Sequence, residues 1–419
     1  MDKFVISGGR KLSGTIGTDG SKNAALPIIV GALLVDKGET VLQNIPPLRD
    51  IEIIIKVMEH LGARIEYDPA AMQMTIDASE LTTTTAPYDL IRKMRASFLV
   101  LGPLLARLGE ARVSLPGGCV LGARPVDYHI AGFGRLGAEI KSEGGFVIAR
   151  GKKLKGGIVH FDRPSHTGTE NIIFGAVTAE GVTRIINAAC DPEVVDVAAF
   201  LNEAGARIDG AGTATITIRG VKRLKPVTYK ISGDRLVAGT FMCAAAITGG
   251  EIKVTGVEPS HLTMVSHKLA EMGCRITEHR NRIEIAGPRQ LKATRVVTFP
   301  YPGFPTDLQA SIMALTTVAS GTSSIKETVF EDRFSHTMEL RRLGADINVT
   351  MDEAIIKGVP KLKGTSVMAS DIRAGAGLVV ASLAAAGKSE VLRIYHIDRG
   401  YHRLEEKLSA LGADIKRID

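Results

Sequence analysis

Apolar positions along this chain form two patterns, one typical of buried helices and one typical of half-buried strands. Six segments are apolar on nearly all faces and rich in Ala, Leu and Gly: 23–35, 95–108, 170–179, 235–248, 308–320 and 372–386. A helix that is apolar all round lies inside a protein, so these segments are predicted to be buried helices. Each ends near a glycine, and a short β-type run follows, such as 41–44 or 325–329.

A second, amphipathic helix recurs with a common ending, Leu-Gly-Ala-x-Ile or a close variant. Its copies begin at Leu61, Leu136, Ala204, Met272, Leu343 and Leu411, at spacings of 75, 68, 68, 71 and 68 residues. The glycine of each copy occupies the place of a left-handed residue that ends a helix, and an alternating strand segment follows. Six copies at a near-constant period identify an internal repeat.

One repeat therefore contains a buried helix, an exposed helix such as 51–60 or 401–410, and several strands. Three repeats can bury their apolar helices together behind sheets that face outward, and two such triplets make two similar domains. The repeat is far longer than a solenoid unit, which favours closed globules. We predict an α/β fold with two domains, each an inside-out barrel with helices inside and sheets outside.

Length and composition are those of a globular protein with more than one core. The chain has 419 residues, 45% hydrophobic and 23% charged. No apolar run has the length that spans a bilayer, and the first residues lack the layout of a signal peptide, so we expect a cytoplasmic protein. The cysteines lack the spacing of a metal site, and we expect neither a disulfide nor a metal or other cofactor. Cys243 and Cys274 fit helical core positions, and Cys190 stays unassigned.

The charge distribution points to small anionic substrates. The formal net charge is +7, from 52 basic and 45 acidic residues, which suits nucleic acid or small polyanions. The chain has no Trp and no basic run interleaved with aromatics, so we expect no nucleic-acid partner. Arg49, Arg124 and Arg399 each precede a repeat ending by 12 residues, and Lys22 and Arg95 stand where buried helices begin. If these ends of two domains face each other, they line a positively charged cleft.

One thiol lies in a setting that favours reactivity. In the run 115–129, Cys119 stands among glycines and prolines, with Arg124 five residues later. Glycine and proline favour a tight exposed turn. A guanidinium group and the start of a helix, predicted at Pro125, both stabilise a thiolate or an anionic ligand. Cys119 is therefore a candidate nucleophile or acid, and a buried structural thiol is the alternative.

Further candidates stand at the starts of the buried helices. Lys22 and Asn23 follow Gly20 and Ser21, an arrangement that binds an anion or is an ordinary serine cap beside a solvated lysine. Asp307 is either a helix cap or a general base toward a hydroxyl group. For Arg373, Arg399 and the pair Asp332-Arg333, surface ion pairs are the alternative to an anion site.

Together these motifs resemble the UDP-N-acetylglucosamine 1-carboxyvinyltransferase family, the enolpyruvyl transferases of peptidoglycan synthesis. The resemblance covers essentially the whole chain and is carried by residues 19–27, 92–97, 116–129, 304–307, 327–331 and 394–401. It implies transfer of the enolpyruvyl group of phosphoenolpyruvate to the 3′-hydroxyl of the sugar nucleotide, through a tetrahedral ketal. It also implies domains of residues 22–232 and of residues 1–21 plus 233–419, with the active site in the cleft between them.

The resemblance also implies roles for residues at matching positions. Lys22, Arg124 and Arg399 are similar to groups that hold phosphoenolpyruvate, Cys119 to a reactive general acid, and Asp307 to the base that deprotonates the sugar hydroxyl. Residues similar to sugar-nucleotide contacts are Asn23, Arg95, Arg124, Pro125, Val126, Asp127, Tyr128, Arg163, Ser165, His166 and Val329. Those similar to residues lining the cleft are Arg333, Asp371 and Arg373.

The chain departs from the family pattern at residues 165–169, Ser-His-Thr-Gly-Thr, where many members read Ser-Val-Gly-Ala-Thr. Because Cys119 is retained, sensitivity to the epoxide antibiotic fosfomycin is expected. Two other functions remain open from the residues alone. One is the shikimate-pathway enolpyruvyl transferase, which the stretch around Cys119 disfavours, and the other is a non-catalytic basic binding module.

Overall fold

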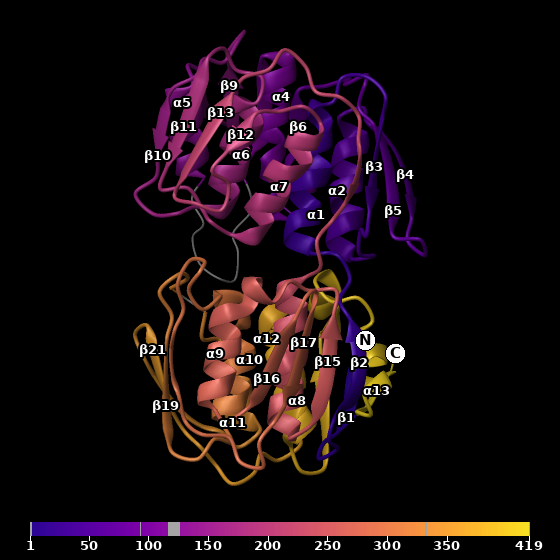
Figure 1. The fold of residues 1–419 in the computed structure, drawn as a ribbon, viewed down its shortest axis with the longest axis vertical. Helices are drawn as coiled ribbons and strands as arrows, with labels where there is room; N and C mark the ends of the chain where they lie inside the picture. The colour runs from indigo at the N-terminus through magenta and orange to yellow at the C-terminus, as the bar shows by residue number, and fades with distance from the viewer. Residues whose placement is uncertain (1, 93, 116–125, 332, 419) are drawn as a thin grey trace. The chain divides into compact units, whose positions relative to one another are not determined.

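A computed structural model describes residues 2–92, 94–115, 126–331 and 333–418 (Figure 1). The chain divides into two compact units, each with its own hydrophobic core. We call residues 20–115 and 126–232 the central unit, and residues 2–19 and 233–418 the terminal unit. None of the helices in the described ranges combines the length and apolar character that a membrane crossing requires.

Each unit contains three four-stranded sheets built on one pattern. In one sheet of the central unit, β10 (Ile158–His160) pairs parallel with β11 (Val182–Ile186). Strand β13 (Thr215–Arg219) then pairs antiparallel with β11 and with β12 (Ile208–Asp209). The other sheets repeat this order of one parallel and two antiparallel pairs, so the sixfold repeat of the sequence is a sixfold structural repeat.

The remaining strands belong to five sheets, in each of which neighbouring strands pair in the following order. In the central unit they are β14 (Thr228–Lys230), β3 (Glu39–Gln43), β5 (Gln73–Asp77) and β4 (Arg64–Asp68); and β6 (Thr85–Ala86), β7 (Glu110–Ser114), β9 (Phe146–Arg150) and β8 (Glu139–Glu143). In the terminal unit they are β22 (Ser366–Met368), β23 (Lys388–Leu392), β1 (Lys3–Ser7) and β24 (Asp414–Ile418); β16 (Arg275–His279), β17 (Arg282–Ala286), β15 (Glu251–Thr255) and β2 (Ser13–Gly17); and β18 (Arg295–Val297), β19 (Thr322–Lys326), β21 (Glu353–Lys357) and β20 (Asp346–Thr350).

Strands from the beginning of the chain complete sheets of the terminal unit. Strand β1 lies between β23 and β24, with Val5 opposite Glu390 and Lys416, and β2 pairs parallel with β15. Strand β14, at the end of the central unit, pairs with β3 near its beginning. The chain therefore starts in the terminal unit, builds the central unit, and returns.

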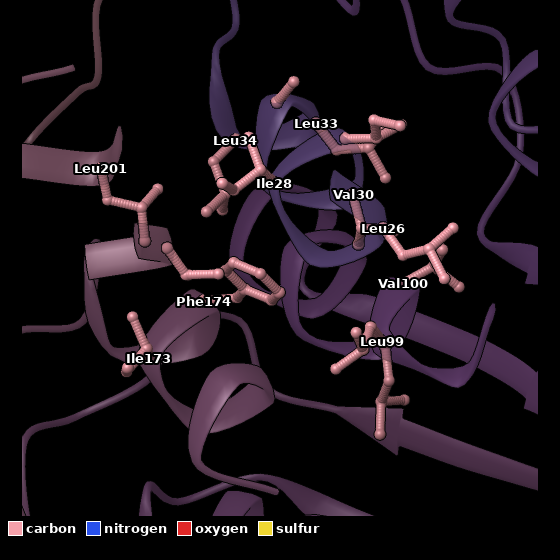
Figure 2. Close-up of a cluster of buried hydrophobic side chains, with 14 of the residues drawn as sticks. Leu26, Ile28, Val30, Leu33, Leu34, Leu99, Val100, Ile173, Phe174 and Leu201 are labelled. Carbon is pink, nitrogen blue, oxygen red and sulfur yellow. The ribbon is translucent and has the colours of Figure 1, made fainter. Parts of the chain in front are cut away.

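The six predicted buried helices are present, and they form the cores of the two units. In the central unit they are α1 (Lys22–Gly31) with η1 (Ala32–Leu34), η2 (Arg95–Val100) with α4 (Leu101–Leu108), and α6 (His166–Ala176). In the terminal unit they are α8 (Arg235–Thr248), η4 (Thr306–Leu308) with α10 (Gln309–Thr316), and α12 (Ile372–Ala384). Figure 2 shows side chains of α1, η2 and α6 meeting in the central core.

Several helix bounds differ from the prediction by a few residues; for example, α6 ends at Ala176 rather than at residue 179, and α12 at Ala384 rather than at residue 386. Helix α6 begins four residues before the predicted start, because the Ser165 hydroxyl oxygen accepts the Gly168 N–H at 3.2 Å and caps an otherwise polar first turn. Helix α10 ends at Thr316 rather than at residue 320.

Helices α10 and α12 pack closely because Gly377 is small: a Cβ atom on Gly377 of α12 would lie 2.8 Å from the Ala310 backbone of α10.

The outer helices are amphipathic and end as predicted. They are α2 (Arg49–His60), α5 (Asp127–Arg135), α7 (Pro192–Glu203), α9 (Thr263–Glu271), α11 (Thr337–Arg342) and α13 (Leu404–Ala410). Three shorter helices are α3 (Tyr88–Ile91), which precedes η2, η3 (Pro259–Leu262), which precedes α9, and η5 (Ile394–Arg399), which precedes α13. The six repeat glycines that follow them have φ between 86° and 105°, a range that glycine adopts without strain. This confirms their predicted role in ending helices.

The sheets bury one face and expose the other. In β5, Met74 and Ile76 are buried, whereas Gln73 on the other face is exposed. The same alternation occurs in β7, β17 and β21. Because the buried faces cover the apolar helices, the predicted arrangement of inner helices and outer sheets is confirmed.

Candidate active site

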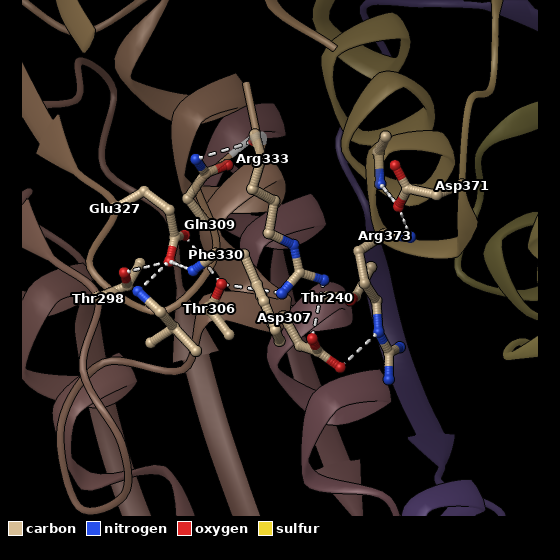
Figure 3. Close-up of polar contacts among 12 residues, drawn as sticks. Thr240, Thr298, Thr306, Asp307, Gln309, Glu327, Phe330, Arg333, Asp371 and Arg373 are labelled. Atoms are coloured by element: carbon tan, nitrogen blue, oxygen red, sulfur yellow. Dashed lines mark hydrogen bonds and ion pairs between the residues drawn. The ribbon is translucent and has the colours of Figure 1, made fainter. Parts of the chain in front are cut away.

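The carboxylate of Asp307 lies between two buried arginines of the terminal unit (Figure 3). The Arg333 Nη2 atom donates to Asp307 Oδ1 at 2.8 Å, and the Arg373 Nε atom donates to Oδ2 at 3.1 Å. Asp307 keeps 24% of its side-chain surface exposed, whereas the arginine side chains keep only 7% and 5%. The N-cap residues of η4 and α10 are Pro305 and Leu308, so the alternative of a helix-capping Asp307 is wrong.

Arg373 is held at the start of α12 by three neighbours. The Asp371 carboxylate caps the helix, accepting the N–H groups of Arg373 and Ala374 at 2.9 and 3.0 Å. The guanidinium carbon of Arg373 lies 5.4 Å from the centre of the Tyr401 ring. Burial opposes the charge of Arg373, but Tyr401 and Asp307 outweigh burial and raise its pKa. Arg373 therefore keeps a fixed positive charge beside Asp307, and it is not a surface ion pair.

A buried carboxylate, Glu327, organises the residues around Val329. Its Oε1 atom accepts the Val329 and Phe330 N–H groups at 2.8 and 3.1 Å, and the Thr298 hydroxyl at 2.8 Å. Its Oε2 atom accepts the Thr306 hydroxyl at 2.8 Å. Sequence reasoning assigned no role to Glu327, although it stands in one of the motifs that carry the resemblance. Its position directly after the strand β19 was the sequence feature that could have identified it as a functional residue.

In the central unit, Lys22 is the first residue of α1 and forms a buried ion pair. Its Nζ atom lies 2.9 Å from Asp50 Oδ2 in α2, and the side chains keep 10% and 2% of their surface exposed. The alternative of a solvated lysine is therefore wrong. Asn23 follows on α1 and is half-buried, and Arg95 opens η2 just as Lys22 opens α1. Sequence reasoning missed Asp50, since nothing in its own helix indicates a partner 28 residues away.

Besides Asn23 and Arg95, the predicted sugar-nucleotide contacts described in the central unit lie at or shortly before the starts of α5 and α6. Val126 is buried, Asp127 is exposed, and the ring of Tyr128 packs edge-on against Phe161 at 5.3 Å. Arg163 is exposed, and Ser165 caps α6.

A buried network joins these two helices. The Asn171 amide accepts the Gly102 N–H at 2.8 Å and donates to His129 Nδ1 at 2.9 Å. Burial lowers the pKa of His129 to about 3, with Arg95 contributing in the same direction, so the neutral ring can accept at Nδ1. The network holds α5, α6 and the start of α4 together.

One group of side chains has the composition of a cation site. His166, Asp191 and Glu193 offer ligand atoms within 4.8 Å of one another, and no other such group occurs in the described ranges. Yet the His166 ring nitrogens lie 3.1 Å from Glu170 and 3.5 Å from Asp191. Burial lowers the pKa of His166, but these carboxylates outweigh burial and raise it well above its ordinary value. A protonated ring offers no lone pair to a metal, so we interpret the group as an internal ion cluster.

The remaining candidates divide between described and undescribed residues. Arg399 closes η5 and is half-buried. Cys119, Arg124 and Pro125 lie outside the described residues, as does Asp332. Among the described thiols, Cys243 and Cys274 are free and buried, which confirms their predicted core positions, and burial raises the pKa of Cys274 to about 12.

Comparison with known proteins places this arrangement in a family. A family model described as EPSP synthase (3-phosphoshikimate 1-carboxyvinyltransferase) matches residues 6–408. The UDP-N-acetylglucosamine 1-carboxyvinyltransferase of Desulfosudis oleivorans is 52% identical over 418 residues, which cover 100% of both chains. That of Trichlorobacter lovleyi is 52% identical over 419 residues, covering 100% of this chain and 99% of the relative.

Solved structures share the fold over its full length. The enolpyruvyl transferase NikO from Streptomyces tendae superimposes with a TM-score of 0.88 at 25% identity, covering 99% of this chain and 98% of that chain. An EPSP synthase from Acinetobacter baumannii gives a TM-score of 0.76 at 20% identity, covering 100% of both chains. The predicted enolpyruvyl transferase fold is thereby confirmed.

Proposed function

The chain belongs to the UDP-N-acetylglucosamine 1-carboxyvinyltransferase family, and from this membership we propose its reaction. It transfers the enolpyruvyl group of phosphoenolpyruvate to the 3′-hydroxyl of UDP-N-acetylglucosamine and releases phosphate, the first committed step of peptidoglycan synthesis. The observation that carries this proposal is the 52% identity to relatives of that name over the full length of both chains. Identity to the EPSP synthase structure is only 20%, which disfavours shikimate 3-phosphate as the acceptor.

Asp307 is the proposed base toward the sugar hydroxyl. Its carboxylate is the partly exposed member of an otherwise buried group, and its two oxygens accept from Arg333 and Arg373. These contacts fix the orientation in which the carboxylate meets an incoming hydroxyl. The arginines stabilise the ionised form, which is the form that takes a proton.

The reaction proceeds by addition and elimination. The methylene carbon of phosphoenolpyruvate receives a proton, and the 3′-oxygen, deprotonated toward Asp307, bonds to the central carbon to give a tetrahedral ketal. A proton then leaves the methyl carbon and the C–O bond to phosphate breaks, which restores the double bond as an enolpyruvyl ether. Cys119 is the proposed acid, and Lys22, Arg124 and Arg399 hold phosphoenolpyruvate and stabilise its developing charge.

The proposed sugar-nucleotide contacts come from both units. Those of the terminal unit are Val329, Asp371, Arg333 and Arg373. The other proposed contacts are Asn23, Arg95, Arg124, Pro125, Val126, Asp127, Tyr128, Arg163, Ser165 and His166. The many charged and polar side chains in this set can bind the phosphates and hydroxyl groups of a nucleoside diphosphate sugar.

Phosphate release tests the reaction and its acceptor together. We expect release from phosphoenolpyruvate with UDP-N-acetylglucosamine and none with shikimate 3-phosphate. An Asp307→Asn variant keeps the shape of the base but not its proton affinity, so we expect turnover to fall by at least about 100-fold. Release with shikimate 3-phosphate alone, or with neither acceptor, would refute the proposed substrates, and near-normal turnover of the variant would refute the base.

The mass of the protein after incubation with phosphoenolpyruvate tests the thiol. We expect an added mass equal to that of phosphoenolpyruvate, mapped by peptide digestion to Cys119. The Cys119→Ala variant is the matched control and should stay unmodified. An adduct that persists in this variant would assign the reactive group to another residue.

A further inference from the structure

We infer that Glu327 is a positioning residue, whose single buried carboxylate places both the Val329 turn and, through Thr306 and Arg333, the base Asp307. This inference rests on the proposed function, because it gives Asp307 and Val329 their roles. All five residues belong to the terminal unit. Figure 3 shows Glu327, Thr306, Arg333 and Asp307 linked by hydrogen bonds. Glu327 itself keeps only 3% of its surface exposed, so it does not contact a substrate directly.

The first oxygen of Glu327 shapes the turn that carries Val329. Oε1 accepts the backbone N–H groups of Val329 and Phe330 at 2.8 and 3.1 Å. It also accepts the hydroxyl of Thr298, at 2.8 Å, and that hydroxyl oxygen in turn accepts the Thr328 N–H at 3.0 Å. The backbone N–H groups of residues 328–330 therefore all donate either to Glu327 Oε1 or to the Thr298 hydroxyl that is bonded to it.

The second oxygen leads to the base. Oε2 accepts the Thr306 hydroxyl at 2.8 Å, and the Thr306 oxygen accepts Arg333 Nη1 at 2.8 Å. The other terminal nitrogen of Arg333, Nη2, donates to Asp307 Oδ1 at 2.8 Å. A guanidinium group is planar and rigid, so fixing Nη1 on Thr306 also fixes the direction in which Nη2 meets Asp307.

The direction of these hydrogen bonds requires a carboxylate at position 327. Glu327 accepts four hydrogen bonds and donates none, which an ionised carboxylate can do and an amide cannot. The Thr306 hydroxyl must donate to Glu327, because its oxygen accepts from Arg333. Arg333 therefore donates in both directions, to Asp307 directly and towards Glu327 through the Thr306 hydroxyl.

Substitutions can separate the two branches. In Glu327→Gln the amide oxygen can still accept at the Val329 turn, while the NH2 group faces Thr306 and leaves the Thr306 proton without an acceptor. Thr306→Val removes the same link with little change of volume, and Thr306→Ser keeps the hydroxyl. Thr298→Val weakens only the Oε1 branch. Thr316→Val is the matched control, because the buried Thr316 hydroxyl donates to the Met313 carbonyl of α10 at 2.7 Å.

Steady-state phosphate release separates positioning from a general loss of stability. A misplaced reacting group costs about 10–100-fold in rate, so we expect kcat to fall by this factor in Glu327→Gln and Thr306→Val. The KM for UDP-N-acetylglucosamine should stay within about threefold of wild type. KM rises when a variant loses a substrate contact made equally in the ground state and the transition state, and these two variants keep such contacts. Thr306→Ser should recover most of kcat, and Thr298→Val should mainly raise KM.

The outcomes distinguish this inference from the proposed function. A wild-type protein that releases no phosphate would refute the proposed function itself. If the wild type is active but Thr306→Val keeps full kcat, or loses no more than Thr316→Val does, then Glu327 does not position the base. The inference also fails if Thr306→Ser is as impaired as Thr306→Val, because the hydroxyl would then be irrelevant.

Discussion

The buried pair of Lys22 and Asp50 gives a prediction about stability that the structure makes quantitative. Asp50→Asn keeps the size of the side chain and removes its charge, so Lys22 is left as a buried ammonium group without its carboxylate at 2.9 Å. Lys22 is also the first residue of α1, where the positive end of the helix dipole disfavours a cation. In the wild type the Asp50 carboxylate offsets both the burial of Lys22 and this dipole, so we expect its removal to destabilise the central unit.

The magnitude follows from burial. Breaking a buried ion pair by removing one partner costs about 3–5 kcal/mol. Because the Lys22 side chain keeps 10% exposure, we expect a value near the lower end, about 3 kcal/mol. For a unit of roughly 200 residues, each kcal/mol shifts the melting temperature by about 2–4 °C. The expected decrease for the central unit is therefore about 6–12 °C.

Thermal unfolding followed by circular dichroism measures this shift, and the same unit offers a matched control. Arg223 and Asp36 form a pair of nearly equal length, 2.8 Å, whose side chains keep 47% and 43% exposure. An exposed pair contributes about 0–1 kcal/mol, so Asp36→Asn should lower the melting temperature far less. A decrease for Asp50→Asn no larger than that for Asp36→Asn would show that burial does not strengthen the Lys22 pair.

Two further predictions concern the central unit. Carboxylates beside His166 overcome the effect of burial and raise its pKa well above the ordinary value of 6.5. Their stabilisation is therefore complete below about pH 6.5 and is lost as the pH rises through the raised pKa. Urea unfolding from pH 6 to 10 should show this loss, and a His166→Gln variant should lack it. Gly102→Ala would place a Cβ atom 2.4 Å from Asn171 Oδ1, at a cost of about 1–3 kcal/mol. The control Gly134→Ala, on a helix position with nothing within 4 Å, should instead stabilise by up to about 1 kcal/mol, and equal unfolding midpoints for the two alanine variants would contradict this reasoning.

The sequence by itself determined the repeat, the type of each main element and its inner or outer place. These properties depend on local patterns, because an apolar residue on every face of a helix allows only a buried position. The segment 235–248 was predicted with the bounds of α8. Helix α6 was predicted to start too late, since its first turn is polar and is held by the Ser165 cap rather than by apolar periodicity.

Tertiary structure decided which residues meet. Lys22 and Asp50 stand at the starts of different helices, and Arg373 reaches Asp307 across 66 residues of sequence. The alternating pattern of β1 likewise indicates a strand with one buried face. The position of β1 between β23 and β24, however, depends on how the last repeat packs. Periodicity reports the environment of one element at a time, whereas the partners of a buried charge depend on how several elements pack together. The ion pairs around Asp307 and the four hydrogen bonds of Glu327 therefore became visible only in the folded chain.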